Sequence, residues 1–228
     1  MENESQSNID ISDKDIWDAQ CGDGKTMMKI GYELSMGTEE NEEQALLWYE
    51  EAAKRHYVSD YFIRKYADKG GTANLEKAFV FCVNSYNTTY DTNLRHTARL
   101  INWHEEQSDD FWFDTAVKYN ILDEFVNSLR LNYDKLTIER RKVWLTKAID
   151  AGNINAMYVM ACLSNGEERK HWLTEAALRD NQSAIDELVK YYYMRSDHQE
   201  VIYWGEKSKG TYTRSLVEKS KRELEELR

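Results

Sequence analysis

A bulky aromatic ring recurs along the chain at a nearly constant spacing. Successive rings stand 33, 31, 32, 28 and 32 residues apart, at Trp48, Phe81, Trp112, Trp144, Trp172 and Trp204. A small residue follows each ring four positions later, at Ala52, Ser85, Ala116, Ala148, Ala176 and Ser208. Residues four apart share one face of an α-helix, so each ring lies beside its small neighbour. Self-similarity at this period predicts an array of helix pairs, each covered by the next.

The composition favours an all-α fold. The 228 residues include no proline and only 10 glycines. Proline lacks the backbone N–H and clashes with the preceding turn of a helix, so its absence is typical of an almost wholly helical protein. Hydrophobic residues make up 41% of the chain, and the apolar runs are only a few residues long. We therefore expect no membrane span.

Three segments are expected along the chain. Residues 1–16 are acidic, lack the features of an export signal, and are predicted to be flexible. Residues 17–210 are predicted to form the helical repeat array, whose first hairpin ends one helix at Gly37 and places the second over residues 42–54. Gly31 in the first helix allows the second to approach closely. Residues 211–228 predict a capping helix with a polar outer face.

Several segments of the chain resemble a known repeat family. They are Ile30-Gly31-x-x-Leu34-x-x-Gly37 with Ala45-Leu-Leu-Trp48-Tyr49-Glu-Glu-Ala52-Ala53, and Ala151-Gly152-Asn-Ile-Asn-Ala156 with Trp172-Leu-Thr-Glu-Ala176-Ala177. This pattern resembles the Sel-one-like repeat (SLR), a relative of the tetratricopeptide repeat, over roughly residues 20–210. The resemblance implies an all-α, right-handed superhelical solenoid of about six antiparallel helix pairs. It also implies an interaction scaffold without catalytic residues.

No cofactor, metal or catalytic site is expected from the motifs. Cys21, Cys82 and Cys162 are an odd number, widely spaced, with no C-x-x-C among them, so we expect reduced thiols in a cytoplasmic protein. The five histidines form no H-E-x-x-H motif, and the serines form no G-x-S-x-G turn. We therefore expect a protein that is not an enzyme.

One segment matches a loose nucleotide-binding motif. Ala19-x-x-x-x-Gly24-Lys25-Thr26 has the spacing of a phosphate-binding loop, with alanine in the first glycine position. Phosphate binding by such a loop needs a buried strand before it and a helix after it. The preceding residues are mostly acidic and predict no strand, so a nucleotide-binding protein or enzyme is the alternative interpretation rather than the first.

The charge and the repeat pattern together suggest the partner. A formal charge of −11 disfavours nucleic acid and anionic membranes and favours a protein partner with a basic surface. The first helix of each pair lines the concave groove in related superhelices, and aromatic residues and arginine are favoured in binding hot spots. The candidate partner-binding residues are Tyr32, Lys65, Arg95, Arg99, Asp123, Asp186 and Tyr193.

Three functions are consistent with these features. The first is a noncatalytic adaptor that holds a protein or peptide in its groove, or, more narrowly, an inhibitor or immunity protein that blocks a toxin or effector. The second is the nucleotide binder described above. The third is a structural module that stacks with other copies in a larger assembly; the sequence leaves the number of copies open.

Overall fold

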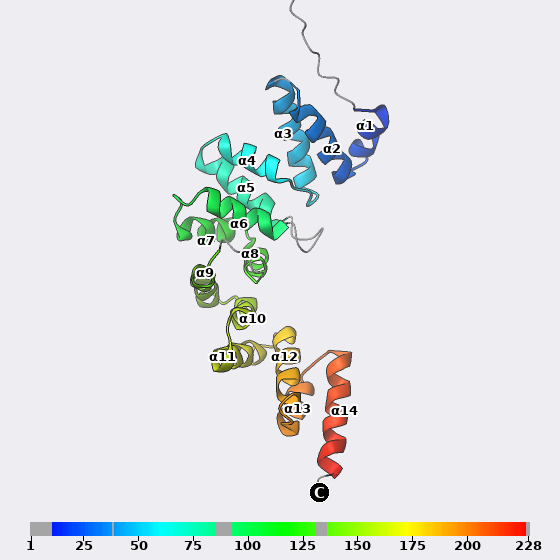
Figure 1. The fold of residues 1–228 in the computed structure, drawn as a ribbon, viewed down its shortest axis with the longest axis vertical. Helices are drawn as coiled ribbons and strands as arrows, with labels where there is room; N and C mark the ends of the chain where they lie inside the picture. The colour runs from blue at the N-terminus through cyan, green and yellow to red at the C-terminus, as the bar shows by residue number, and fades with distance from the viewer. Residues whose placement is uncertain (1–10, 38, 85–92, 131–135, 227–228) are drawn as a thin grey trace, which may run out of the picture. The chain divides into compact units, whose positions relative to one another are not determined.

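The computed structural model describes residues 11–37, 39–84, 93–130 and 136–226 of the chain, without the side chains of residues 39, 40 and 93–95. These ranges hold fourteen α-helices and no β-strand, which confirms the expected all-α class (Figure 1). None of the described helices is both long and apolar enough to cross a bilayer. The chain divides into two compact units, residues 1–135 and 136–228. The division falls inside the stretch 17–210 that the repeat pattern treats as one array.

Unit 1 contains eight described helices, most of which pack on a neighbour in sequence. In addition, α4 packs on α6, and α5 packs on both α7 and α8. The helices are α1 (Asp13–Gln20), α2 (Gly24–Ser35), α3 (Glu39–Ala53), α4 (Asp60–Asp68), α5 (Thr72–Asn84), α6 (Asn93–Trp103), α7 (Asp109–Lys118) and α8 (Leu122–Ser128).

Helix α1 begins inside the segment 1–16 that the sequence predicts to be flexible. Ser12 and Asp15 form a capping box: the Ser12 hydroxyl accepts a hydrogen bond from the backbone N–H of Asp15, and the Asp15 side chain accepts one from the backbone of Ser12. This reciprocal cap satisfies two N–H groups that would otherwise lack partners. The Asp15 carboxylate also pairs with Lys29 of α2 at 2.9 Å, which ties α1 to the next helix.

The first hairpin forms as the sequence predicts, through a close contact at Gly31. A β-carbon at Gly31 would lie 3.0 Å from the ring of Tyr49 in α3, a tight contact that glycine avoids. Helix α3 begins at Glu39, three residues earlier than expected.

Aromatic side chains fill the core of unit 1. Phe79, Trp112 and Phe125 are fully buried, and the Phe79 ring lies 5.2 Å from the Trp112 ring and 5.3 Å from the Phe125 ring. The three residues come from α5, α7 and α8, so one aromatic cluster joins three helices. Aromatic pairs in edge-to-face or tilted geometries stabilise a fold by more than the burial of their surface area alone.

Unit 2 contains the other six described helices. Sequence neighbours pack on one another along this unit, and α12 also packs on α14. The hydrogen-bonding caps include Thr137, Asn153 and Asn181, whose side chains accept hydrogen bonds from backbone N–H groups three residues on. The helices are α9 (Ile138–Asp150), α10 (Ile154–Leu163), α11 (Gly166–Ala177), α12 (Gln182–Tyr193), α13 (His198–Gly205) and α14 (Thr211–Glu226).

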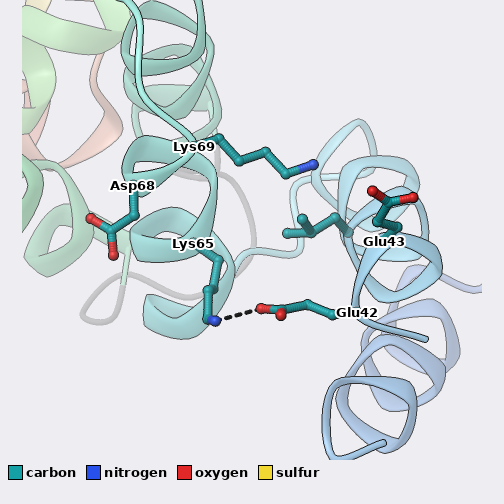
Figure 2. A pocket seen from close by; sticks show the side chains of 6 residues that line it. Glu42, Glu43, Lys65, Asp68 and Lys69 are labelled. Carbon is teal, nitrogen blue, oxygen red and sulfur yellow. Dashed lines mark ion pairs between the residues drawn. The ribbon is translucent and has the colours of Figure 1, made fainter. Parts of the chain in front are cut away.

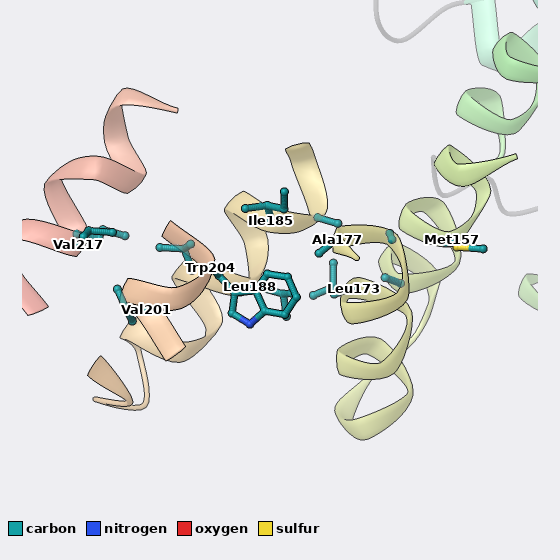
Figure 3. Close-up of a cluster of buried hydrophobic side chains, with 13 residues drawn as sticks. Met157, Leu173, Ala177, Ile185, Leu188, Val201, Trp204 and Val217 are labelled. Carbon is teal, nitrogen blue, oxygen red and sulfur yellow. The ribbon is translucent and has the colours of Figure 1, made fainter. Parts of the chain in front are cut away.

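A hydrophobic cluster runs through five helices of unit 2 (Figure 3). Leu173 of α11, Ile185 and Leu188 of α12, and Trp204 of α13 are buried side by side within it. Burying side chains of this size contributes about 1.5–3 kcal/mol each. Leu216 and Val217 of α14 complete the cluster, so the C-terminal helix is part of the fold of the unit.

The contact of α14 with α13 depends on Gly205. A methyl group of Val217 occupies the space where a β-carbon of residue 205 would lie. Beside it, the Ser208 hydroxyl lies 2.5 Å from that of Thr213, and the backbone N–H of Gly210 donates to Ser208. The expected C-terminal helix is therefore present at Thr211–Glu226, packed on α12 and α13.

The repeat pattern predicts that all six recurring rings are buried, but only three of them are. Trp112, Trp144 and Trp204 are buried, whereas Trp48, Phe81 and Trp172 are only partly covered. After each of these three rings, the following residue faces the core instead: Tyr49 is 2% exposed, Cys82 is 1% exposed and Leu173 is 1% exposed. One residue along a helix turns the side chain by about 100°. A small rotation of the helix therefore decides which of the two neighbours is buried.

Candidate interaction surface

A cleft of about 360 Å³ lies between α3 and α4 in unit 1 (Figure 2). Lys65 and Lys69 stand four residues apart on α4 and its C-terminal end, and both side chains reach toward α3 (Figure 2). Leu46 adds an apolar side chain to a wall that is otherwise charged. The lining residues are Glu42, Glu43 and Leu46 from α3, and Lys65, Asp68 and Lys69 from α4 or its C-terminal end.

An ion pair closes one end of the cleft. The Lys65 ammonium lies 2.5 Å from Glu42 Oε1, and the two side chains point toward each other across the gap between the helices (Figure 2). The hydrogen bond from Lys65 lowers the pKa of the Glu42 carboxyl group. Tyr61, one turn before Lys65, donates a hydrogen bond of 3.4 Å to the same carboxylate oxygen. Lys65, a predicted partner-binding residue, is therefore engaged within the unit.

Tyrosines from three helices meet next to this ion pair. The ring of Tyr49 in α3 lies 6.0 Å from the ring of Tyr61 in α4. Burial raises the pKa of the Tyr49 hydroxyl to about 12, and the nearby hydroxyls of Tyr61 and Tyr32 act in the same direction. Tyr49 is 2% exposed, whereas Tyr32 of α2 is 56% exposed and Tyr61 is 37% exposed, so a buried tyrosine lies near two exposed ones.

Arg99, another predicted residue, joins α6 to α4. Its guanidinium forms an ion pair with the carboxylate of Asp60 in the first turn of α4. The imidazole Nε2 of His96 lies 3.2 Å from the other oxygen of Asp60, but the two groups are not aligned for a hydrogen bond. Burial lowers the pKa of His96 to about 4, so the ring is neutral at pH 7.

The remaining predicted residues fall in several places. Asp123 is an exposed residue in the first turn of α8, and the side chain of Arg95 lies outside the described residues. Asp186 and Tyr193 belong to α12 of unit 2. Of the predicted residues, Tyr32 and Lys65 thus lie near Tyr49 and Tyr61. Arg99 pairs with α4, the helix that carries Lys65.

Asp186 holds a turn in place within unit 2. Its carboxylate accepts a hydrogen bond of 2.5 Å from the Ser208 hydroxyl in the segment between α13 and α14. A β-carbon at Gly210 would lie 3.2 Å from one of its oxygens. This internal bond gives Asp186 a structural role that its place on an outward helix face does not reveal.

Tyr193 packs partly against the hydrophobic cluster of unit 2, as does Tyr192. Tyr191 is also partly covered, and the guanidinium of Arg195 stacks 3.6 Å from the centre of its ring. All three consecutive tyrosines are thus partly covered, and none is fully buried.

The loose phosphate-binding motif has a different structural context from the one that phosphate binding needs. Helix α1, not a strand, precedes Gly24. The carboxylate of Asp23 caps the start of α2, where it accepts hydrogen bonds from the Lys25 backbone N–H at 3.1 Å and the Thr26 hydroxyl at 2.6 Å. A negative side chain thus occupies the helix end that would have to receive a phosphate. Gly24 is buried, and a β-carbon there would lie 2.5 Å from the Tyr57 ring.

The candidate metal-binding and redox side chains are dispersed. No three histidine, cysteine, aspartate or glutamate side chains within the described ranges gather where they could hold a metal ion. His104 pairs with Glu106 at 2.9 Å in the turn after α6. None of the three cysteines forms a disulfide bond, and Cys82 is buried, as is typical of an inert thiol.

The sequence did not predict four residues around Lys65 and Arg99. Glu42 and Tyr61 contact Lys65, Asp60 pairs with Arg99, and the buried His96 lies beside Asp60. A signal was present for Tyr61, because it stands four residues before Lys65 and must share its helix face. No comparable signal identifies Glu42 or Asp60, since their partners lie 23 and 39 residues away in the sequence. Comparison with models of known protein families, with curated proteins and with solved structures gives no match to this chain.

Proposed function

We infer that this chain is a noncatalytic binding module, and that its partner is a protein or peptide held on the α2–α3–α4 surface of unit 1. The observation that carries this proposal is the presence of two exposed tyrosines, Tyr32 and Tyr61, near the buried Tyr49 and beside a charged cleft. Exposed tyrosines on a rigid helical base supply large contact area at a small cost in side-chain entropy.

The internal ion pairs of this surface support binding rather than catalysis. Lys65 is neutralised by Glu42, and Arg99 by Asp60, so the cations are oriented and held by partners on neighbouring helices. Charged groups that line a binding surface, together with the net charge of −11, steer a complementary partner toward it. An active site would instead need a nucleophile or base in a pocket with a matched proton partner.

The finer architecture that we propose is an SLR-like array of helix pairs. Packing between alternate helices supports it: α4 packs on α6 and α5 on α7 in unit 1, and α12 packs on α14 in unit 2. In a stack of hairpins, the first helix of one pair meets the first helix of the next, and likewise for the second helices. The right-handed superhelix implied by the resemblance belongs to this proposal.

The net charge of −11 suits a partner with a basic surface. Within this proposal, the sharper possibility is a cytoplasmic inhibitor or immunity protein that covers the basic surface of a toxin or effector. The absence of a disulfide among Cys21, Cys82 and Cys162 supports a reducing compartment.

Site-specific photo-crosslinking in the native cell tests the proposed function. A benzophenone side chain at position 32 should capture one discrete partner. The same group at position 212 is the control, because Tyr212 is similarly exposed, at 62%, but lies on α14 of unit 2. Equal capture at both positions, or none at position 32, would contradict the assignment of the surface.

A further inference from the structure

The same three chemical groups meet at two places in unit 1. In the first triad, the Lys65 ammonium lies 2.5 Å from Glu42 and 5.8 Å from the centre of the Tyr61 ring. The hydroxyl of Tyr61 donates to the same carboxylate. A cation placed on a tyrosine ring with a carboxylate beside it gains both charge pairing and attraction to the face of the ring.

The second triad repeats this arrangement between α5 and the end of α7. The Lys118 ammonium lies 2.6 Å from Glu76 and 5.2 Å from the centre of the Tyr119 ring. The Tyr119 hydroxyl donates a hydrogen bond of 3.0 Å to Glu76. The two triads therefore have the same chemistry and nearly the same dimensions.

The triads differ in how open their carboxylates are. The Glu42 side chain is 31% exposed, and both it and Lys65 line the cleft between α3 and α4. The Glu76 side chain is only 12% exposed under Lys118. An incoming side chain therefore has access to the carboxylate of the first triad and is largely shielded from that of the second.

The cleft is lined by residues of both charges. Glu42 and Glu43 come from α3, the carboxylate of Asp68 on α4 pairs with Arg64 at 3.7 Å, and the two cations of the cleft are the ammonium groups of Lys65 and Lys69. One of these, Lys69, reaches across the end of the cleft opposite the Lys65–Glu42 pair (Figure 2). Leu46 offers an apolar wall for the methylene stem of a long side chain.

We propose that Lys65 occupies, in the free protein, a site that accepts an arginine or lysine side chain of the basic partner. The incoming cation displaces the Lys65 ammonium from Glu42 and the Tyr61 ring, and Lys65 turns into water. This step is inexpensive because the Lys65 side chain is already 43% exposed, and surface ion pairs are weak. The inference rests on the proposed function, since it places the partner on the same surface.

The test uses the full chain and a defined probe, an end-blocked peptide of three arginines separated by glycines. Binding is measured at about 0.15 M salt, where long-range attraction is screened beyond roughly 8 Å. The readout is the NMR signal of the Leu46 methyl groups in the cleft. Lys65→Met is the test variant. Lys118→Met is its matched control, because it changes the net charge equally and opens the shielded triad.

Lys65→Met should bind the peptide about threefold or more tightly than the unaltered chain, as expected for release of one surface ion pair. Glu42→Gln should weaken binding, and Lys118→Met should leave the Leu46 titration within about twofold. Equal gains in the two lysine variants would overturn the proposal, since they would reflect net charge alone. A loss of affinity in Lys65→Met, or no response of Leu46 in any variant, would also overturn it. None of these three results bears on crosslinking at position 32, which tests the proposed function separately.

Discussion

The ring of Tyr49 in α3 lies so close to Gly31 in α2 that a β-carbon at position 31 would come within 3.0 Å of it. This contact fixes the distance between the two helices, and it also positions the buried tyrosine that supports Tyr61. The packing of the first hairpin and the candidate interaction surface thus depend on the same pair of residues.

Gly31→Ala should destabilise unit 1 by about 1–3 kcal/mol, the usual cost of forcing extra volume into a packed contact. Alanine favours a helix by about 1 kcal/mol over glycine, so any net loss reports the clash with Tyr49. Urea unfolding measures the difference. A gain in stability would mean that the Tyr49 ring moves aside freely.

Gly205→Ala should loosen α14, because Val217 fills the space beside Gly205. We expect a loss of about 1–3 kcal/mol and faster hydrogen exchange along α14 than along α10. The double variant Gly205→Ala with Val217→Ala should recover part of the loss, since the smaller side chain makes room. Additive effects of the two substitutions in a double-mutant cycle would show that these residues do not compete for space.

Trp144→Ala should cost about 3–5 kcal/mol, since the ring is fully buried in α9. Trp172 of α11 is the comparison within unit 2, and its replacement by alanine should cost clearly less because that ring is only partly covered. Thermal and urea unfolding of both variants give the two values. A cost below about 1 kcal/mol for Trp144→Ala would mean that the ring is exposed in solution.

Unit 1 should lose stability between pH 6.5 and pH 4 because of His96. Its pKa falls from 6.5 to about 4 on burial, so within this window the unfolded chain binds a proton that the folded chain does not. Stability is therefore unaffected by this group above pH 6.5 and falls as the pH drops, by up to about 3 kcal/mol near pH 4. Comparing urea unfolding of the unaltered chain with His96→Leu at pH 7 and pH 4.5 isolates this contribution. Identical pH dependence of the two proteins would show that His96 is not desolvated.

Much of the fold could be predicted because its causes are local. The lack of proline and the recurrence of ring and small residue indicate helices, and the contact at Gly31 follows from a glycine on an apolar helix face. Which of two neighbouring rings is buried could not be predicted. The choice between Trp48 and Tyr49 depends on a rotation of α3 set by its packing on other helices.

The candidate site could be predicted only in part for a related reason. Tyr32 and Lys65 follow from their places on outward helix faces, whereas Glu42 becomes relevant only when α3 and α4 pack. Asp186 shows the converse: its position along α12 suggests a free surface residue, but its carboxylate is bound to Ser208 from a later turn. In both cases the role of the residue depends on a contact with a segment that is distant in the sequence.

The most direct test of the proposed surface is the affinity of the crosslinked partner, once purified, for three full-length variants. Tyr32→Ala and Tyr61→Ala should each weaken binding by about fivefold or more, as expected for hot-spot residues whose loss costs over 1 kcal/mol. Tyr212→Ala, on α14, should leave the affinity unchanged. Unaltered affinity in both unit 1 variants would contradict the assignment of the α2–α3–α4 surface as the binding site.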